Sequence, residues 1–181
     1  MNCWLCTQWW CDAPMKALTR LALTLCVLIG CVGCDQLSKA AARAYLPGTG
    51  IHSYLGDTFR LQYAENPGAF LGFGASLSGS SRYSIFTLGL GALVTALLLW
   101  SVLSRRLEWP QRLCIAVIGA SGAANIIDRI RYDGAVTDFL NLGVGDLRTG
   151  IFNLADVTLI LGVLGLLLVP HLLKSRKVRS R

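Results

Sequence analysis

Long apolar stretches separated by short polar segments dominate the 181-residue sequence. Four of these stretches are long enough to form buried or membrane-spanning helices: 17–34, 83–103, 113–127 and 157–173. About 20 residues are needed to cross about 30 Å of hydrocarbon, a length that 83–103 reaches without interruption. The first and third stretches look short because they run into Asp35 and Asp128, but a helix can continue past an acid that faces a protein interior. The pattern therefore predicts four membrane-spanning helices.

An alternation of apolar and polar residues in the first long polar segment predicts a short strand. Phe59, Leu61 and Tyr63 alternate with other residues, and the sequence NPG at 66–68 is a strong turn signal. The second long polar segment, 129–152, has several glycines and too few apolar residues for a separate domain. We expect it to be a loop, and both segments to pack on the outer membrane face.

Composition and charge support a membrane protein and suggest its orientation. Hydrophobic residues make up 54% of the chain and charged residues only 15%, an apolar share above the usual soluble level. Ten of the 17 Lys and Arg residues fall on one predicted side: Lys16, Arg20, Arg105, Arg106, Arg112, Lys174, Arg176, Lys177, Arg179 and Arg181. Because basic segments stay in the cytoplasm, both termini are predicted to be cytoplasmic. The net charge of +7 is thus a topology signal and does not support nucleic-acid binding.

These observations define a fold class and a division of the chain. We predict an all-α membrane protein with four transmembrane helices, both termini cytoplasmic, and a small β-containing extracytoplasmic loop region. Residues 1–14 are interpreted as a leader before a natural start at Met15, residues 15–175 as the membrane domain, and 176–181 as a basic cytoplasmic tail. The seven cysteines predict no disulfide framework, and with only two histidines present we expect no metal site.

Three acids with amide neighbours stand out near the predicted outer surface. In the sequence NIIDR, Asn125, Asp128 and Arg129 have spacings that place them on one helix face. In FNLAD, the same three-residue step puts Asn153 beside Asp156. The sequence VTDF adds Asp138 from the intervening loop.

Two neighbouring carboxylates in a partly dry site share a proton, because both cannot ionise easily. One member can then take a proton from water while the other donates to a carbonyl oxygen, as in aspartic proteases. The alternative is structural: these acids would pair with Arg129 and Arg131, or face headgroup water.

A further polar pair lies in the sequence DQLSK at the outer end of the first helix. Asp35 and Lys39 are four residues apart and can pair on a helix, with Lys39 extending toward water. Ser38 and Lys39 are adjacent and point about 100° apart, which argues against a Ser/Lys nucleophile.

The motifs DQLSK, NPGAF, NIIDR, VTDF and FNLAD, in this order, resemble those of lipoprotein signal peptidase, the bacterial signal peptidase II family. The resemblance covers about residues 15 to 175. It implies an intramembrane aspartic endopeptidase that removes signal peptides from diacylglyceryl-modified prolipoproteins, cutting before the lipidated cysteine. It assigns the catalytic aspartates to Asp138 and Asp156. Supporting or substrate-contacting roles fall on Asp35, Lys39, Asn66, Asn125, Asp128, Arg129 and Asn153.

The resemblance also implies where the protein works and with what. The expected place is the bacterial cytoplasmic (inner) membrane, with the active site near the extracytoplasmic face. The expected partners are prolipoproteins and membrane lipid, with no nucleic acid, no cofactor and a monomeric enzyme.

Two other interpretations come from the same residues. The sequence LIGC at 28–31 has the form of a lipobox, which would make the chain itself a lipoprotein cleaved before Cys31. Three later spans make a lipid anchor unnecessary. The second alternative is a small ion or proton transporter that uses the carboxylates as a relay or as metal ligands. Sensitivity to metal chelation would distinguish transport through a metal site from water activation by a metal-free pair.

Overall fold

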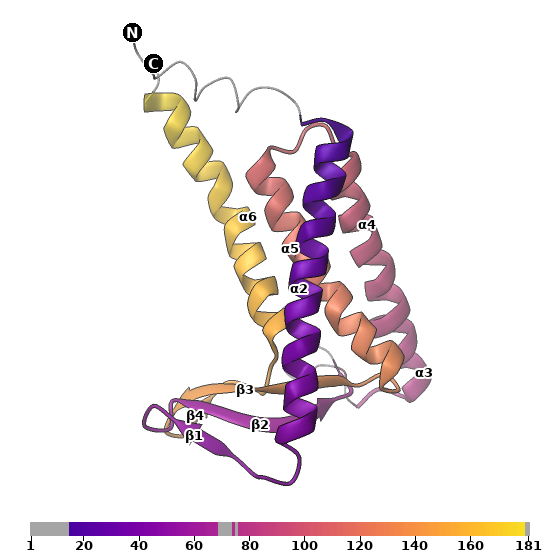
Figure 1. The fold of residues 1–181 in the computed structure, drawn as a ribbon, viewed down its shortest axis with the longest axis vertical. Helices are drawn as coiled ribbons and strands as arrows, with labels where there is room; N and C mark the ends of the chain where they lie inside the picture. The colour runs from indigo at the N-terminus through magenta and orange to yellow at the C-terminus, as the bar shows by residue number, and fades with distance from the viewer. Residues whose placement is uncertain (1–14, 69–73, 75, 180–181) are drawn as a thin grey trace.

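Long helices stand side by side on a small sheet at one end of the molecule (Figure 1). The computed structural model describes residues 15–68, 74 and 76–179, so the predicted leader 1–14 lies outside the described residues. The helices are α2 (Ala17–Tyr45), α3 (Gly79–Arg82), η2 (Tyr83–Gly89), α4 (Leu90–Leu103), α5 (Trp109–Arg131) and α6 (Leu154–Arg179). The strands are β1 (His52–Tyr54), β2 (Phe59–Asn66), β3 (Val136–Val144) and β4 (Leu147–Arg148). Helix α5 packs against α2, α4 and α6 and is therefore the centre of the bundle.

Three helical segments among the described residues have the length and composition to cross a membrane. They are Ala17–Tyr45, Gly79–Leu103 and Trp109–Arg131, and Leu154–Val169 is a shorter apolar helix. The expectation that two helices continue past their acids is confirmed, since α2 runs ten residues beyond Asp35 and α5 three beyond Asp128. Both acids are buried, so neither meets lipid. The protein is therefore a mainly helical integral membrane protein.

The sheet is antiparallel throughout, in the order β1-β2-β3-β4. Strand β2 contains the predicted alternation at 59–63 and continues to Asn66. Its pairing with β3 shifts between Leu61 and Ala64, and beyond this irregularity Ala64 lies opposite Asp138. A further bridge joins Leu140 to Phe152, which brings the segment before α6 onto the sheet.

Strand β3 corrects the prediction that 129–152 is a loop and that Asp138 comes from it. Residues Val136 to Phe139 are all buried, on both faces of the strand. A strand covered on both sides lacks the alternation that reveals a half-exposed strand. Asp138 is consequently held by a hydrogen-bonded ladder, and its position is more constrained than a loop residue's would be.

Candidate active site

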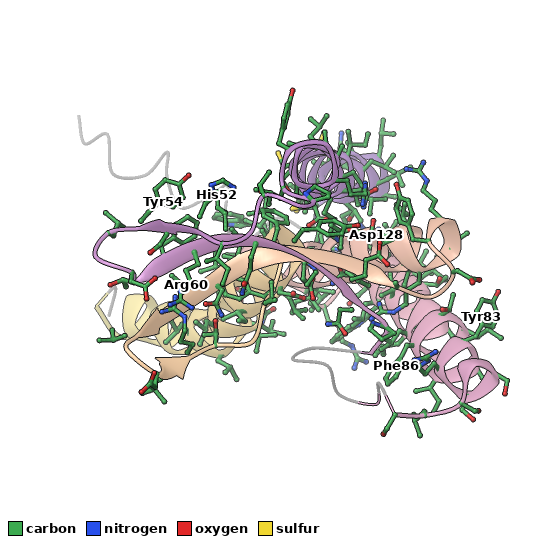
Figure 2. All side chains as sticks on the ribbon, turned by 90° about the horizontal axis from the view of Figure 1, so that it is seen from below. His52, Tyr54, Arg60, Tyr83, Phe86 and Asp128 are labelled. Carbon is green, nitrogen blue, oxygen red and sulfur yellow. The ribbon has the colours of Figure 1, made fainter. Side chains whose placement is uncertain are left out.

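The charged and amide side chains gather where the helices meet the sheet. Figure 2, seen from the sheet end, shows Asp128 near α2, with Arg60 and His52 farther out along the sheet. Asp138 and Asp156 are 2% and 8% exposed, and Asp35, Asp128 and Asn153 are also buried. Four separate elements, α2, α5, β3 and α6, contribute these side chains.

Asp138 receives a hydrogen bond on each carboxylate oxygen. Asn153 Nδ2 donates to Oδ1 at 2.7 Å, and Asn66 Nδ2 donates to Oδ2 at 2.9 Å. The pKa of Asp138 is raised to about 6, with burial as the largest cause. The hydrogen bonds from Asn66 and Asn153 and the charge of Lys39 act in the lowering direction, and the charge of Asp156 acts in the raising direction. The result is a carboxyl group that changes protonation near the neutral range, as acid–base chemistry requires.

Asp156 is fixed by the start of its own helix. Asn153 precedes the first residue of α6, and its Oδ1 accepts from the Asp156 N–H at 3.1 Å. Asp156 Oδ2 accepts from the Asn153 N–H, also at 3.1 Å. This reciprocal pair is a capping box, in which an N-cap side chain and the side chain three residues later satisfy each other's main chain. The predicted neighbourhood of Asn153 and Asp156 is therefore confirmed, and capping is its local cause.

Asn125 connects this helix start to α5 and α2. Its Nδ2 donates to Asp156 Oδ1 at 3.2 Å, and its Oδ1 accepts from Asn153 Nδ2 at 3.2 Å. The same Oδ1 accepts from Lys39 Nζ at 2.7 Å. Each carboxylate of the Asp138 and Asp156 pair is thus held by two donors, and Asn153 bonds to both.

Lys39 is completely buried, which corrects the expectation that it extends toward water. Its Nζ lies 2.8 Å from Asp35 Oδ2 and 3.2 Å from Asp128 Oδ2. Buried charges need pairing and satisfied hydrogen bonds, and two carboxylates with one amide oxygen supply both here. The predicted pair of Asp35 and Lys39 is present, but it belongs to an internal network.

Other bonds fix the two supporting carboxylates. Asp35 Oδ1 accepts from the Ala155 N–H at 2.8 Å, which attaches α2 to the first turn of α6. Asp128 accepts from Gln36 Nε2 at 2.8 Å and from the Thr137 N–H at 3.1 Å, which attaches α5 to α2 and to β3. Sequence reasoning missed Gln36 and Thr137, although each stands next to a predicted site residue and that adjacency was the available signal.

Arg129 makes different hydrogen bonds from the other two residues of the NIIDR motif. It donates from Nη2 to Gly68 O at 2.7 Å, and its guanidinium carbon lies 5.9 Å from the centre of the Phe86 ring. The one-face prediction holds for Asn125 and Asp128, which share Lys39 as a donor. Arg129 bonds to the chain after β2, and its charge also interacts with Asp156, Asp138 and Asp128. The described ion pairs do not include Arg129 or Arg131, so Arg129 interacts with these acids only at longer range.

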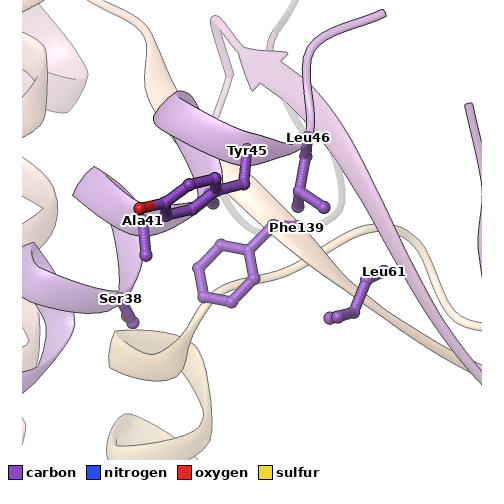
Figure 3. Close-up of a pocket in the computed structure, with 7 residues that line it drawn as sticks. Ser38, Ala41, Tyr45, Leu46, Leu61 and Phe139 are labelled. Atoms are coloured by element: carbon purple, nitrogen blue, oxygen red, sulfur yellow. The ribbon is translucent and has the colours of Figure 1, made fainter. Parts of the chain in front are cut away.

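An apolar pocket of about 330 Å³ lies between the end of α2 and the sheet (Figure 3). Its lining residues are Ser38, Ala41, Ala42, Tyr45, Leu46, Leu61 and Phe139. Neither Asp138 nor Asp156 lines this pocket. Phe139 follows Asp138 on β3, and successive strand residues point to opposite faces, so Asp138 points away from it. In the part of the chain that the structure describes, no group of three His, Cys, Asp or Glu side chains is placed to hold a metal ion.

Comparison with known proteins gives concordant matches. The sequence model of the family described as signal peptidase (SPase) II matches residues 27–172. A lipoprotein signal peptidase of Bifidobacterium adolescentis is 33% identical over 156 residues, covering 83% of this chain and 77% of that protein. One of Burkholderia ambifaria is 37% identical over 149 residues, covering 80% and 84%.

The fold also resembles solved structures. A bacterial membrane enzyme determined by the in meso method at 2.3 Å resolution has a TM-score of 0.69 and 23% identity, covering 84% of this chain and 88% of that one. A bacterial membrane enzyme determined by the same method at 1.9 Å resolution has a TM-score of 0.67 and 22% identity, covering 81% and 90%. These two likenesses concern the fold alone.

Proposed function

The chain belongs to the signal peptidase II family, and from this premise we propose that it is an intramembrane aspartic endopeptidase with Asp138 and Asp156 as its catalytic pair. The substrates are diacylglyceryl-modified prolipoproteins, cleaved before the lipidated cysteine. The observation that carries the assignment is the pair of buried carboxylates joined through Asn153, which donates to both. Asp128 is a weaker candidate because it forms an ion pair with Lys39, whereas the donors to Asp138 and Asp156 are uncharged amide and main-chain groups.

The proposed reaction needs one proton on the pair. The ionised aspartate takes a proton from water as the water oxygen attacks the scissile carbonyl carbon, and the protonated aspartate donates to the carbonyl oxygen. The aspartate that took the water proton then protonates the leaving nitrogen and the C–N bond breaks, while the other aspartate takes a proton from a hydroxyl of the intermediate as the C=O bond re-forms. The pair again carries one proton at the end. Asn66, Asn125 and Asn153 hold the two carboxylates in place, and Asp35, Lys39, Asp128 and Arg129 hold the elements that carry them.

The proposed setting is the inner membrane, with four spans and both termini in the cytoplasm. Helix α6 is the fourth span, and the sheet with the aspartates lies at the extracytoplasmic face. The lipid chains of the substrate remain in the bilayer beside the helices, so membrane lipid is part of recognition. The enzyme works as a monomer without a cofactor.

The decisive experiment is cleavage of a diacylglyceryl-modified prolipoprotein by membranes that contain the intact chain, Asp138→Asn or Asp156→Asn. Because acid–base catalysis contributes about 100-fold or more, each variant is expected to lose at least that factor at equal protein level. Asp146→Asn is the matched control, since Asp146 is an exposed acid in the β3–β4 turn. EDTA is expected to change nothing.

Retention of normal cleavage by either active-site variant would make the pair wrong and direct attention to Asp128. Failure of the intact chain to cut the substrate would contradict the proposed peptidase activity itself. Inhibition by EDTA would favour a metal-dependent reaction.

A further inference from the structure

Two buried arginines from different helices meet at the end of the bundle opposite the sheet. Arg20 lies in the first turns of α2 and Arg112 in the first turn of α5. They are 7% and 1% exposed, although arginine is almost never buried unless it is paired. In Figure 1 the beginnings of both helices lie at the end farthest from the strands. This pair is therefore separate from the aspartate site.

The described partners of both arginines are uncharged main-chain oxygens. Arg20 Nη1 donates to Ser104 O at 2.9 Å and to Leu103 O at 3.3 Å. Arg112 Nη2 donates to Ser104 O at 2.9 Å and to Leu107 O at 3.2 Å. These carbonyls end α4 and form the turn into α5, where the helix dipole is negative. Two full positive charges thus share one oxygen atom and the partial charge of one helix end.

This arrangement leaves positive charge and hydrogen-bond donors unmatched. Among the ion pairs of the described residues, none includes Arg20 or Arg112. Nε of both side chains and Nη1 of Arg112 are buried without a hydrogen-bond partner. Buried donors left unpaired are destabilising, and charged ones more so. Capping of α4 explains the bonds that are made and leaves these three nitrogens without an explanation.

The surroundings place the arginine pair at the level of lipid headgroups. Trp100 and Trp109 flank it on α4 and α5 and are 51% and 54% exposed, and tryptophan is enriched where hydrocarbon meets water. Lys16, Arg105 and Arg106 are exposed at the same end and add positive charge that attracts anions. The planar donors of a guanidinium group match phosphate oxygens.

We propose that Arg20 and Arg112 form a binding site for the phosphate of an anionic phospholipid headgroup. The phosphate oxygens accept from the N–H groups that the α4 carbonyls leave free, and their negative charge offsets the repulsion between the two guanidinium groups. Bound lipid then holds α2, α4 and α5 together at this end. The site is independent of the proposed peptidase activity.

The test measures the thermal unfolding midpoint of the full chain in a neutral detergent, with dioleoylphosphatidylglycerol, dioleoylphosphatidylcholine or inorganic phosphate added. We expect phosphatidylglycerol to raise the midpoint by several degrees and phosphatidylcholine to raise it much less. Arg20→Gln and Arg112→Gln should each lose most of this rise. Arg105→Gln is the matched control, because it removes the same charge from an exposed position at the same end, and it should keep the rise.

A second measurement keeps the proposal testable if the glutamine variants fold poorly. Native mass spectrometry of the intact chain is expected to show a retained phosphatidylglycerol adduct that Arg105→Gln keeps and Arg112→Lys weakens. A rise with inorganic phosphate alone, sensitive to Arg112, would support the phosphate site and assign it to a free anion. Equal responses to both lipids, or equal losses in Arg105→Gln and the buried variants, would overturn it and leave the arginines as caps of α4.

Discussion

Asn153 bonds to both aspartates with different parts of one residue. Its side-chain amide donates to Asp138, and its main-chain N–H donates to Asp156. Its side-chain oxygen meanwhile caps α6 by accepting from the Asp156 N–H. Since the cap requires one orientation of the amide, the direction of the Nδ2 group toward Asp138 follows from the helix start. The hydrogen bonds of Asn153 therefore both cap α6 and position the two carboxylates.

Asn66 offers a test of the proton balance at Asp138. Its amide stabilises the ionised carboxylate, so removing it should raise the Asp138 pKa above its value of about 6. The proposed reaction loses its proton donor as pH rises through the pKa of the pair. Asn66→Ala should therefore move the alkaline limb of the kcat/KM profile upward by about 1 pH unit, as expected for roughly 1.5 kcal/mol from one bond to a charged group.

The measurement is the pH dependence of prolipoprotein cleavage by the intact chain and the variant. Gln62→Ala on the same strand is the control, because no described hydrogen bond joins Gln62 to either aspartate. A lower rate with an unmoved limb would mean that Asn66 acts only in positioning. A limb moved to lower pH would contradict the assigned sign.

The sequence predicted the parts of the site that a single helix determines. Asn153 with Asp156, and Asp35 with Lys39, follow from three- and four-residue spacing and are confirmed. Contacts between separate elements could not be predicted from residue spacing. Asn66, for example, bonds to Asp138 across 72 residues because of the register of β2 on β3. That register depends on an irregularity between Leu61 and Ala64, which has no sequence signal of its own.

At the scale of elements, the predictions for β3 and for Lys39 were wrong because both depend on contacts between separate elements. The helices were predictable because each has a long apolar run, and two of them continue past acids that the interior accepts. The first part of β3, Val136 to Phe139, is buried on both faces and so carries no alternation. Lys39 lies inside the bundle because Asp35 and Asp128 from two helices meet there. Only the assembled bundle determines that environment.

Close packing of α6 on α5 depends on small residues. A Cβ added at Gly162 would lie 2.9 Å from Ile118 Cγ1 and 3.3 Å from Cys114 O, and the latter is main chain that cannot turn aside. Gly162→Ala should therefore lower the free energy of unfolding by about 1–3 kcal/mol, the usual cost of overpacking. The measurement is the unfolding midpoint in detergent.

Gly30→Ala is the matched control on α2, because a Cβ there meets nothing within 4 Å. Alanine also favours a helix interior over glycine by about 0.5–1 kcal/mol, so this variant should be neutral or slightly more stable. Equal destabilisation by both substitutions would show that close contact between α5 and α6 is not the cause.

At the scale of the whole molecule, the bundle has two chemically different ends. The sheet and the buried acids occupy one end, and α2 begins and α6 ends at the other (Figure 1). The basic residues Arg105 and Arg106 lie in the turn at that second end, and the positive-inside rule is the reason for proposing that this end faces the cytoplasm. The proposed orientation follows from this polarity.

Labelling with a membrane-impermeant maleimide tests the orientation. The background is a variant whose seven cysteines are replaced by alanine. In it, Val144→Cys on the exposed end of β3 should react in cells whose outer membrane is permeabilised and whose inner membrane is intact. Arg106→Cys should react only after that membrane is opened. A cysteine in place of Lys177, beyond the apolar part of α6, should behave like Arg106→Cys if α6 is the fourth span. Reaction of the Lys177 variant in intact cells would contradict a fourth crossing.

The attachment of α2 to the start of α6 has a consequence for biosynthesis. Asp35 reaches Ala155 across 120 residues, and Asp156 lies in α6, which is translated after α2, α4 and α5. A nascent chain that has been made as far as β3 holds Asp35, Lys39 and Asp128 but has only Asp138 of the two proposed catalytic carboxylates. Under the proposed assignment, peptidase activity therefore begins only after α6 has been translated and docked. Premature termination before Asn153 would yield a membrane-inserted protein without catalytic capacity.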